Sequence, residues 1–84
     1  MKPIRWTDHA KSRCQARGAT EEEVIKSIRE GMQEPGKQNR ILCRMNFKFN
    51  QQWIGHHYAI KQVAAVISET ESEIIVVTVY TFFY

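Results

Sequence analysis

The spacing of the apolar residues changes near residue 38, and this change limits what the chain can fold into. Before it, apolar side chains recur at helical intervals, at Val24, Ile25, Ile28 and Met32. Beyond it the period is two, so one set of alternate positions is apolar and the other is mostly basic. The apolar set is Ile41, Cys43, Met45, Phe47 and Phe49, and the basic set is Arg40, Leu42, Arg44, Asn46 and Lys48. Helices followed by strands are typical of the α+β class.

Two capping signals define the predicted helices. Thr7 is a suitable N-cap for a helix over residues 8–17, and Gly18 is placed to end it. Thr20 followed three residues later by Glu23 forms a capping-box sequence. Because helical apolar spacing follows this pair, we expect a second helix of about eleven residues.

Turn signals divide the rest of the chain into strands. The polar stretches that predict turns are residues 33–37, 50–52 and 69–72. The strands expected between them are residues 38–49, residues 57–68 as one strand or two, and residues 73–82 as a central strand covered on both faces. The sequence therefore predicts one domain over residues 1–84. Its expected fold is α+β, an N-terminal two-helix hairpin packed on a three- to four-stranded antiparallel β-sheet.

Charge is segregated along the chain. Residues 1–18 hold five basic side chains and one acidic one, and residues 37–61 hold five basic side chains and no acidic one. The other acidic side chains lie in residues 19–36 and 62–84. Folding can turn such segregation into a basic face, the usual footprint of a partner that carries phosphates.

Other sequence features exclude several classes of protein. Two cysteines are too few for the disulfide framework of a small secreted domain. No apolar stretch has the length of a signal peptide or a membrane span, so we expect a cytoplasmic protein with no membrane partner. No His or Cys pair has the spacing of a structural zinc site, and no Gly-rich phosphate loop is present. We therefore expect no metal and no cofactor.

The first candidate site is a ridge on the first predicted helix. His9, Arg13 and Arg17 are spaced by four residues, at the border of the face expected to be buried. An imidazole beside two guanidiniums could bind a phosphate and move a proton. The alternative is that the two arginines belong to a solvated helix face and that His9 caps the start of its own helix.

The second candidate site is the basic side of the first long strand, formed by Arg40, Arg44 and Lys48. Alternate strand positions lie about 6.8 Å apart, close to the spacing of successive phosphates on a single strand. The alternative is an ordinary solvent-facing strand. His57 and Tyr80 are further candidates for proton transfer. Tyr58, Tyr80 and Tyr84 could stack on bases, although in a small chain aromatic rings more often belong to the core or its rim.

A family resemblance covers nearly the whole chain. The residues that carry it are Thr7-Asp8-His9-Ala10, Arg13, Ala16-Arg17-Gly18-Ala19-Thr20, Glu21-Glu22-Glu23-Val24 and Ile75-Val76-Val77-Thr78-Val79-Tyr80. With these residues the chain resembles the bacterial domain of unknown function 4258. The resemblance implies a relationship to RelE/ParE-type plasmid toxins, whose fold is a helical hairpin on a small antiparallel sheet. Among such relatives some are metal-independent ribonucleases and others poison a topoisomerase by contact.

Three functions stay open at this point. The first is a toxin-like domain that binds RNA and cleaves it without a metal, with His9 as base or acid, His57 or Tyr80 as its partner, and Arg13, Arg17 and Arg44 on the phosphate. The second is a binding module without catalysis, which contacts RNA or an antitoxin protein. The third is a homodimer whose basic face has no ligand.

Overall fold

The structure is a computed structural model and describes residues 2–84. In chain order its elements are β1 (Ile4–Trp6), α1 (Asp8–Ala16), α2 (Glu21–Glu30), β2 (Met32–Pro35), β3 (Ile41–Trp53), β4 (His56–Glu69) and β5 (Ile74–Phe83). The strands form one five-stranded sheet in the order β1-β5-β4-β3-β2. β1 runs parallel to β5, and every other neighbouring pair is antiparallel.

Both helices begin and end where the capping signals predict, to within one residue. The Thr7 side chain accepts a hydrogen bond from the Ala10 N–H, and Thr20 and Glu23 form the reciprocal capping box. Gly18 follows α1 with a φ of 75°, in the region that favours glycine. A Cβ at this position would also lie 2.7 Å from the Trp53 ring, so this turn requires glycine on both grounds.

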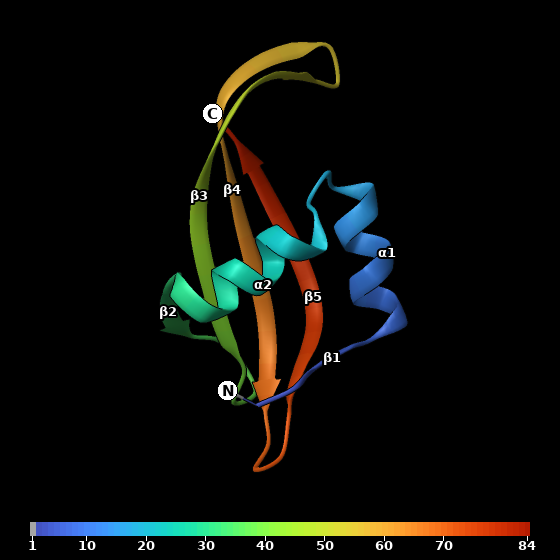
Figure 1. Ribbon diagram of the computed structural model, residues 1–84, viewed down its shortest axis with the longest axis vertical. Coiled ribbons are helices and arrows are strands. Elements are labelled where there is room, and N and C mark those ends of the chain that lie inside the picture. Colours follow the sequence, from blue (N-terminus) through green and yellow to red (C-terminus); the bar gives the residue numbers. More distant parts are fainter. Residues whose placement is uncertain (1) are drawn as a thin grey trace.

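The two helices cover one face of the sheet and leave the other without a helix. α2 lies across β3 and β4, and α1 lies against β5 (Figure 1). We call the side toward the helices the helix-covered face and the opposite side the open face. The core fills the space under the helices, and its members are Ala10, Cys14, Val24, Ile28, Cys43, Val63, Ala65, Ile67, Ile74, Val76 and Val79.

Two further contacts fasten the helix-covered face. The Lys61 ammonium on β4 is buried, 2.7 Å from the Glu23 carboxylate and 2.9 Å from the Gly18 carbonyl oxygen. It therefore joins β4 to the start of α2.

Beyond the helices the long β3–β4 hairpin projects from the body (Figure 1). Three aromatic rings, of Phe49, Trp53 and Tyr58, pack around Phe83 with centroid distances of 5.2, 5.2 and 5.6 Å.

The expected arrangement of an N-terminal helical hairpin on an antiparallel sheet is wrong. A strand precedes the helices, and the sheet has five strands instead of three or four and is mixed. The Ile74 N–H donates to the Pro3 carbonyl and the Thr7 N–H to the Val76 carbonyl, which fastens β1 along the edge of β5. Because β1 spans three residues, it is too short for a two-residue period to be visible in the sequence.

Two of the predicted turns are also wrong. Residues 32–35 form β2, an exposed edge strand that pairs with β3 and ends at Pro35, a position where proline is tolerated. Residues 50–52 belong to β3, which continues through a bulge to Trp53 and turns at Ile54 and Gly55. The strand expected after it is one strand, β4. No helix within residues 2–84 is long and apolar enough to cross a membrane.

Candidate functional site

A β-bulge in β5 decides which of its side chains face the helices. Val66 pairs with Thr78 and Ile67 pairs with Val76, so Val77 has no partner of its own. An extra residue of this kind reverses the alternation of the side chains that follow it. Before the bulge, the buried residues of β5 are Ile74 and Val76, and after it the buried residue is Val79. Thr78, Tyr80 and Phe82 turn to the open face as a result.

The open face is a regular array of side chains from β3, β4 and β5. Reading across the strands, its rows are Leu42–Val66–Thr78, Arg44–Ala64–Tyr80 and Asn46–Gln62–Phe82. A fourth row is Lys48–Ile60–Tyr84, since Tyr84 and Ile60 exchange backbone hydrogen bonds. Rows repeat about every 6.8 Å, and the outer columns lie two strand spacings apart, about 10 Å. A column of aromatic rings on β5 therefore faces a column rich in cations on β3.

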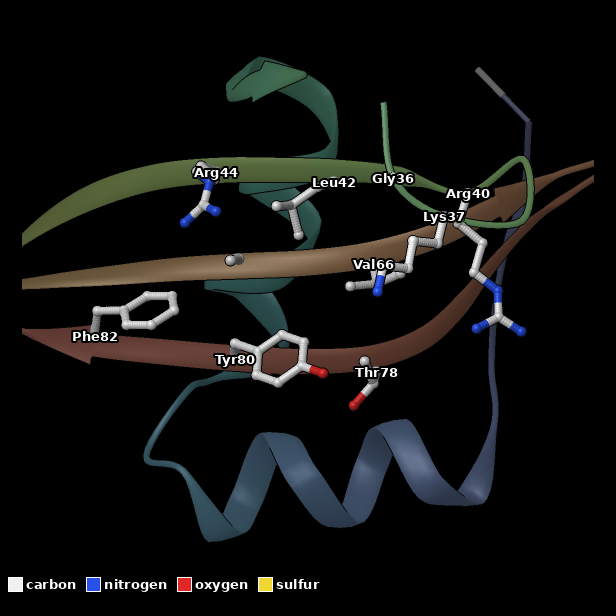
Figure 2. A pocket seen from close by; sticks show the side chains of 10 residues that line it. Gly36, Lys37, Arg40, Leu42, Arg44, Val66, Thr78, Tyr80 and Phe82 are labelled. Atoms are coloured by element: carbon white, nitrogen blue, oxygen red, sulfur yellow. The ribbon is translucent and has the colours of Figure 1, made fainter. Parts of the chain in front are cut away.

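A shallow cavity of about 390 Å³ lies at the centre of this array. Its lining residues are Gly36, Lys37, Arg40, Leu42, Arg44, Ala64, Val66, Thr78, Tyr80 and Phe82. Figure 2 shows α2 behind the sheet and the rings of Tyr80 and Phe82 turned toward the open side. The floor is apolar, and one wall carries the cationic side chains of Lys37, Arg40 and Arg44.

The cations of this wall differ in how they are neutralised. Arg44 Nε donates to a Glu34 carboxylate oxygen at 2.9 Å, so part of its charge is balanced. Among residues 2–84, Lys37, Arg40 and Lys48 form no ion pair with a carboxylate. Lys37 and Lys48 are exposed and Arg40 is partly exposed, so a phosphate can reach these charges at little desolvation cost.

The middle of β5, which carries Thr78 and Tyr80, lies next to α1. The His9 Nε2 atom is 3.2 Å from the Thr78 hydroxyl oxygen, and the His9 ring is exposed. The Arg17 guanidinium lies 4.8 Å from the centre of the Tyr80 ring and donates to the Val79 carbonyl at 2.8 Å. Arg17 is thus held at the edge of β5 with its charge against an aromatic ring.

The structure gathers most, though not all, of the predicted site residues. Tyr80, Arg40 and Arg44 line the cavity, and Lys48 continues the Arg44 column. His9 and Arg17 do not line it, but they contact the lining residues Thr78 and Tyr80. Arg13 is exposed on α1 and does not line the cavity.

The structure does not bring His57 to His9. His57 pairs with Gln52 next to the hairpin turn, at the top of Figure 1. Val66, whose partner Thr78 contacts His9, is nine residues further along β4, a path of about 30 Å.

Three residues of the open face were missed in the sequence. They are Lys37, Gln62 and Phe82. The available signal was the alternation of Thr78, Tyr80, Phe82 and Tyr84, which share one parity at the end of the last strand. This signal was hard to recognise because Val77, the extra residue of the bulge, is apolar like its neighbours. The sequence of the strand therefore looks like one continuous apolar run, although its side chains alternate in the opposite sense before and after Val77.

Thiol chemistry and a metal centre find no support in the geometry. Cys14 and Cys43 are free thiols in the core, and burial raises the pKa of each above its ordinary value. Within residues 2–84 no three His, Cys, Asp or Glu side chains gather closely enough to hold a metal ion.

The sequence was compared with known proteins. Neither the curated proteins nor the solved structures yield a match. The model of one family, described as Domain of unknown function (DUF4258), matches residues 6–81, a span that runs from the end of β1 into the last part of β5 and includes both sides of the cavity. The chain therefore belongs to the DUF4258 family.

Proposed function

We propose that this protein binds single-stranded RNA along the open face of its sheet. The observation that carries the proposal is the pairing of two columns on that face. Along β5, the rings of Tyr80, Phe82 and Tyr84 are 43%, 41% and 61% exposed. Along β3, the cations of Arg44 and Lys48 share one side of the strand. Exposed rings beside a basic track are the two features that non-duplex nucleic acids require.

The spacing of the array fits a single strand. Rows about 6.8 Å apart match the distance between successive phosphates on an extended chain. Two strand spacings separate the columns, which allows a nucleotide to place its phosphate on the β3 side and its base on the β5 side. A duplex keeps its bases stacked on each other, so its bases cannot use these rings. A single strand is therefore the form that the open face favours.

The two columns contribute differently to the free energy of binding. Stacking of a base on an aromatic ring is worth about 1–3 kcal/mol, and it varies little with the base. Phosphate contacts release counterions, so their contribution falls as salt rises. Since Glu34 balances part of the Arg44 charge, Arg40, Lys37 and Lys48 carry most of the salt-dependent attraction.

Fluorescence anisotropy with a labelled, mixed-sequence RNA of about twelve nucleotides tests the proposal. We expect binding to the single strand that is at least fivefold tighter than binding to the same RNA in a duplex, and that weakens with salt. Phe82→Ala should weaken it about fivefold or more, because one stacking platform is lost. Arg29→Ala, at an exposed position on α2, is the matched control and should bind like the wild type.

The opposite pattern would contradict the proposal. Equal affinity for duplex and single strand would mean that the rings are not used. Loss of binding in the Arg29 variant together with an unchanged Phe82 variant would move the interface to the helical side. A single-stranded DNA of the same sequence, included as a separate arm, shows whether the ribose 2′-hydroxyl contributes.

A second candidate function is cleavage of the bound RNA, which the contact between His9 and Thr78 favours at the α1 side of the cavity. In that reaction His9 removes the proton of a ribose 2′-hydroxyl, the 2′-oxygen attacks the phosphorus, and the bond to the 5′-oxygen breaks. Tyr80, two residues beyond Thr78 on the same face, is the group that would protonate the leaving oxygen. The Arg17 guanidinium beside it would stabilise the charged transition state.

Incubation of the protein with the same RNA in EDTA tests this candidate. Wild-type protein should yield a 2′,3′-cyclic phosphate and a free 5′-hydroxyl, and His9→Ala should bind the RNA without cleaving it. An intact RNA after incubation with wild-type protein would remove cleavage and leave RNA binding untouched. The antitoxin partner, the homodimer and the cytoplasmic location stay predictions.

A further inference from the structure

One row of the open face carries a chain of hydrogen bonds between polar side chains. Arg44 Nη1 donates to Gln62 Oε1 at 3.0 Å, and Gln62 Nε2 donates to Asn46 Oδ1 at 2.9 Å. The chain starts at Glu34, which accepts from Arg44 Nε at 2.9 Å. Gln62 pairs across the strands with Phe82, so the chain borders the ring of Phe82.

Arg44 determines which way the two amide groups of this chain are oriented. A guanidinium has only donors, so the atom of Gln62 that meets Arg44 must be the carbonyl oxygen. The amide nitrogen of Gln62 is then the atom that faces Asn46, and it requires the carbonyl oxygen of Asn46 as its acceptor. Each amide oxygen accepts one hydrogen bond inside the chain and keeps one further lone pair. Among residues 2–84 the second N–H of Gln62 Nε2 and both N–H groups of Asn46 Nδ2 have no acceptor, so the unpartnered N–H donors outnumber the remaining lone pairs.

We infer that this donor row selects guanine over adenine for the base that stacks on Phe82. The inference rests on the proposed function, because it describes one position of the bound RNA. The Hoogsteen edge of guanine offers two adjacent acceptors, N7 and O6, which match a row of donors. Adenine offers N7 beside an amino group, so one N–H of the row would face another N–H.

Partial exclusion of water from the row would make this selection count in free energy. A base stacked on Phe82 would cover one side of Gln62 and Asn46, and Arg44 lies over the same ring, 5.7 Å from its centre. A donor covered in this way without an acceptor loses its hydrogen bond to water. Adenine would therefore bind more weakly, because its amino group leaves one N–H donor of the row without an acceptor, whereas guanine supplies an acceptor to each of two donors.

Binding of modified oligonucleotides tests the inference. The probe is an octa-adenosine RNA in which one central adenosine is replaced by guanosine, inosine or 7-deazaguanosine. We expect guanosine to bind at least about fivefold more tightly than adenosine, the lower end for a bidentate base contact. Inosine keeps N7 and O6 and should match guanosine. The 7-deaza base lacks N7 and should bind more weakly than guanosine.

Three variants connect the preference to the row. Asn46→Ala should lower the guanosine-to-adenosine ratio toward one. Gln62→Glu offers two acceptors, so Asn46 must turn its N–H donors inward and its carbonyl outward, and the ratio should fall to one or below. Lys48→Ala is the matched control on the same strand face, and it should weaken all the RNAs alike with an unchanged ratio.

The outcomes separate this inference from the proposed function. If every oligonucleotide binds with equal affinity, or if the Gln62 and Asn46 variants keep the wild-type ratio, the donor row does not select the base, and RNA binding stands. If none of the oligonucleotides binds, both the RNA-binding function and the selectivity are wrong.

Discussion

The two faces of the sheet are built from the same strands, yet their side chains serve different purposes. On β4, Val63, Ala65 and Ile67 point toward the helices and are at most 1% exposed. Across the open face, two rings of β5 keep about two fifths of their surface in water. Burial of apolar surface stabilises the fold, so the first face contributes most to stability, and the partly exposed rings contribute less. Exposed apolar patches of this kind usually mark a contact surface.

The faces also differ in how they treat charge. On the helix-covered face the Lys61 ammonium, the one buried ammonium among residues 2–84, has both a carboxylate and a carbonyl as partners. On the open face Arg40 and Lys48 have no carboxylate partner among residues 2–84. A buried charge without a partner is costly, whereas an exposed one costs little and can attract a polyanion. One face is therefore complete in the isolated chain, and the other is suited to a ligand.

The largest expected effect is on stability, and it compares two adjacent residues of β4 that lie on opposite faces of the sheet. Ile67→Ala should lower the free energy of unfolding by about 2–5 kcal/mol, because it leaves a cavity in the core. Val66→Ala, on the open face, should cost clearly less, since water can fill the space. Urea unfolding at one temperature measures both. Similar losses in the two variants would break the distinction between a structural face and a binding face.

The next effect concerns RNA affinity, with a smaller loss of stability than in the core. Tyr80→Ala should weaken RNA binding by about 1–3 kcal/mol, since a stacking platform is removed, and should lower the unfolding free energy less than Ile67→Ala does. Tyr80→Phe keeps the ring and should bind RNA like the wild type. Anisotropy titrations alongside urea unfolding give both quantities. If Tyr80→Ala is strongly destabilised and still binds RNA like the wild type, the ring contributes to stability and not to RNA binding.

A smaller effect is expected in the salt dependence of binding. Arg40→Ala should lower the slope of log affinity against log salt by about 0.7, the value for one phosphate contact on a single strand. Glu34→Gln should raise affinity modestly, because it releases the Arg44 charge that Glu34 balances. Titrations at several salt concentrations measure the slopes. If the slope of log affinity against log salt is unchanged in the Arg40 variant, Arg40 does not contact a phosphate of the RNA.

The smallest expected effect is a pH dependence of stability, which arises from two thiols buried beneath the helices. Burial raises the pKa of the Cys14 and Cys43 thiols above the ordinary value of 9.0. The folded state therefore holds these protons more tightly than the unfolded state. This stabilisation is complete below pH 9.0 and is lost as the pH rises through the folded pKa. Urea unfolding at pH 7 and pH 10 should show a loss that is reduced in the Cys43→Ala variant.

The elements with strong local signals could be predicted from the sequence. Both helices follow from their capping residues, and the two-residue period of β3 separates its buried positions from its basic ones. β1 and β2 could not be predicted in this way. They are short edge strands that depend on pairing with β5 and β3, and such tertiary contacts leave no period in three or four residues.

The cations of the candidate site could be predicted from the sequence, and Tyr80 and Tyr84 could be named as stacking candidates, but the arrangement of the rings in one column could not be predicted. Arg40, Arg44 and Lys48 follow from the period of one strand. The ring column requires the bulge at Val77, and a bulge depends on the register of β4 against β5, which local sequence does not specify. The separation of His9 from His57 is equally a matter of topology, since it depends on the length of the β3–β4 hairpin.

The most direct test of the account is to map the RNA contact on the folded protein. Amide chemical shifts of ¹⁵N-labelled protein would be followed while a single-stranded RNA is added to saturation. The account predicts that the changes concentrate in residues 40–48 of the β3 side and residues 78–84 of β5, with α2 nearly unaffected. Changes centred on α2, or no changes at an RNA concentration well above that of the protein, would contradict binding at the open face.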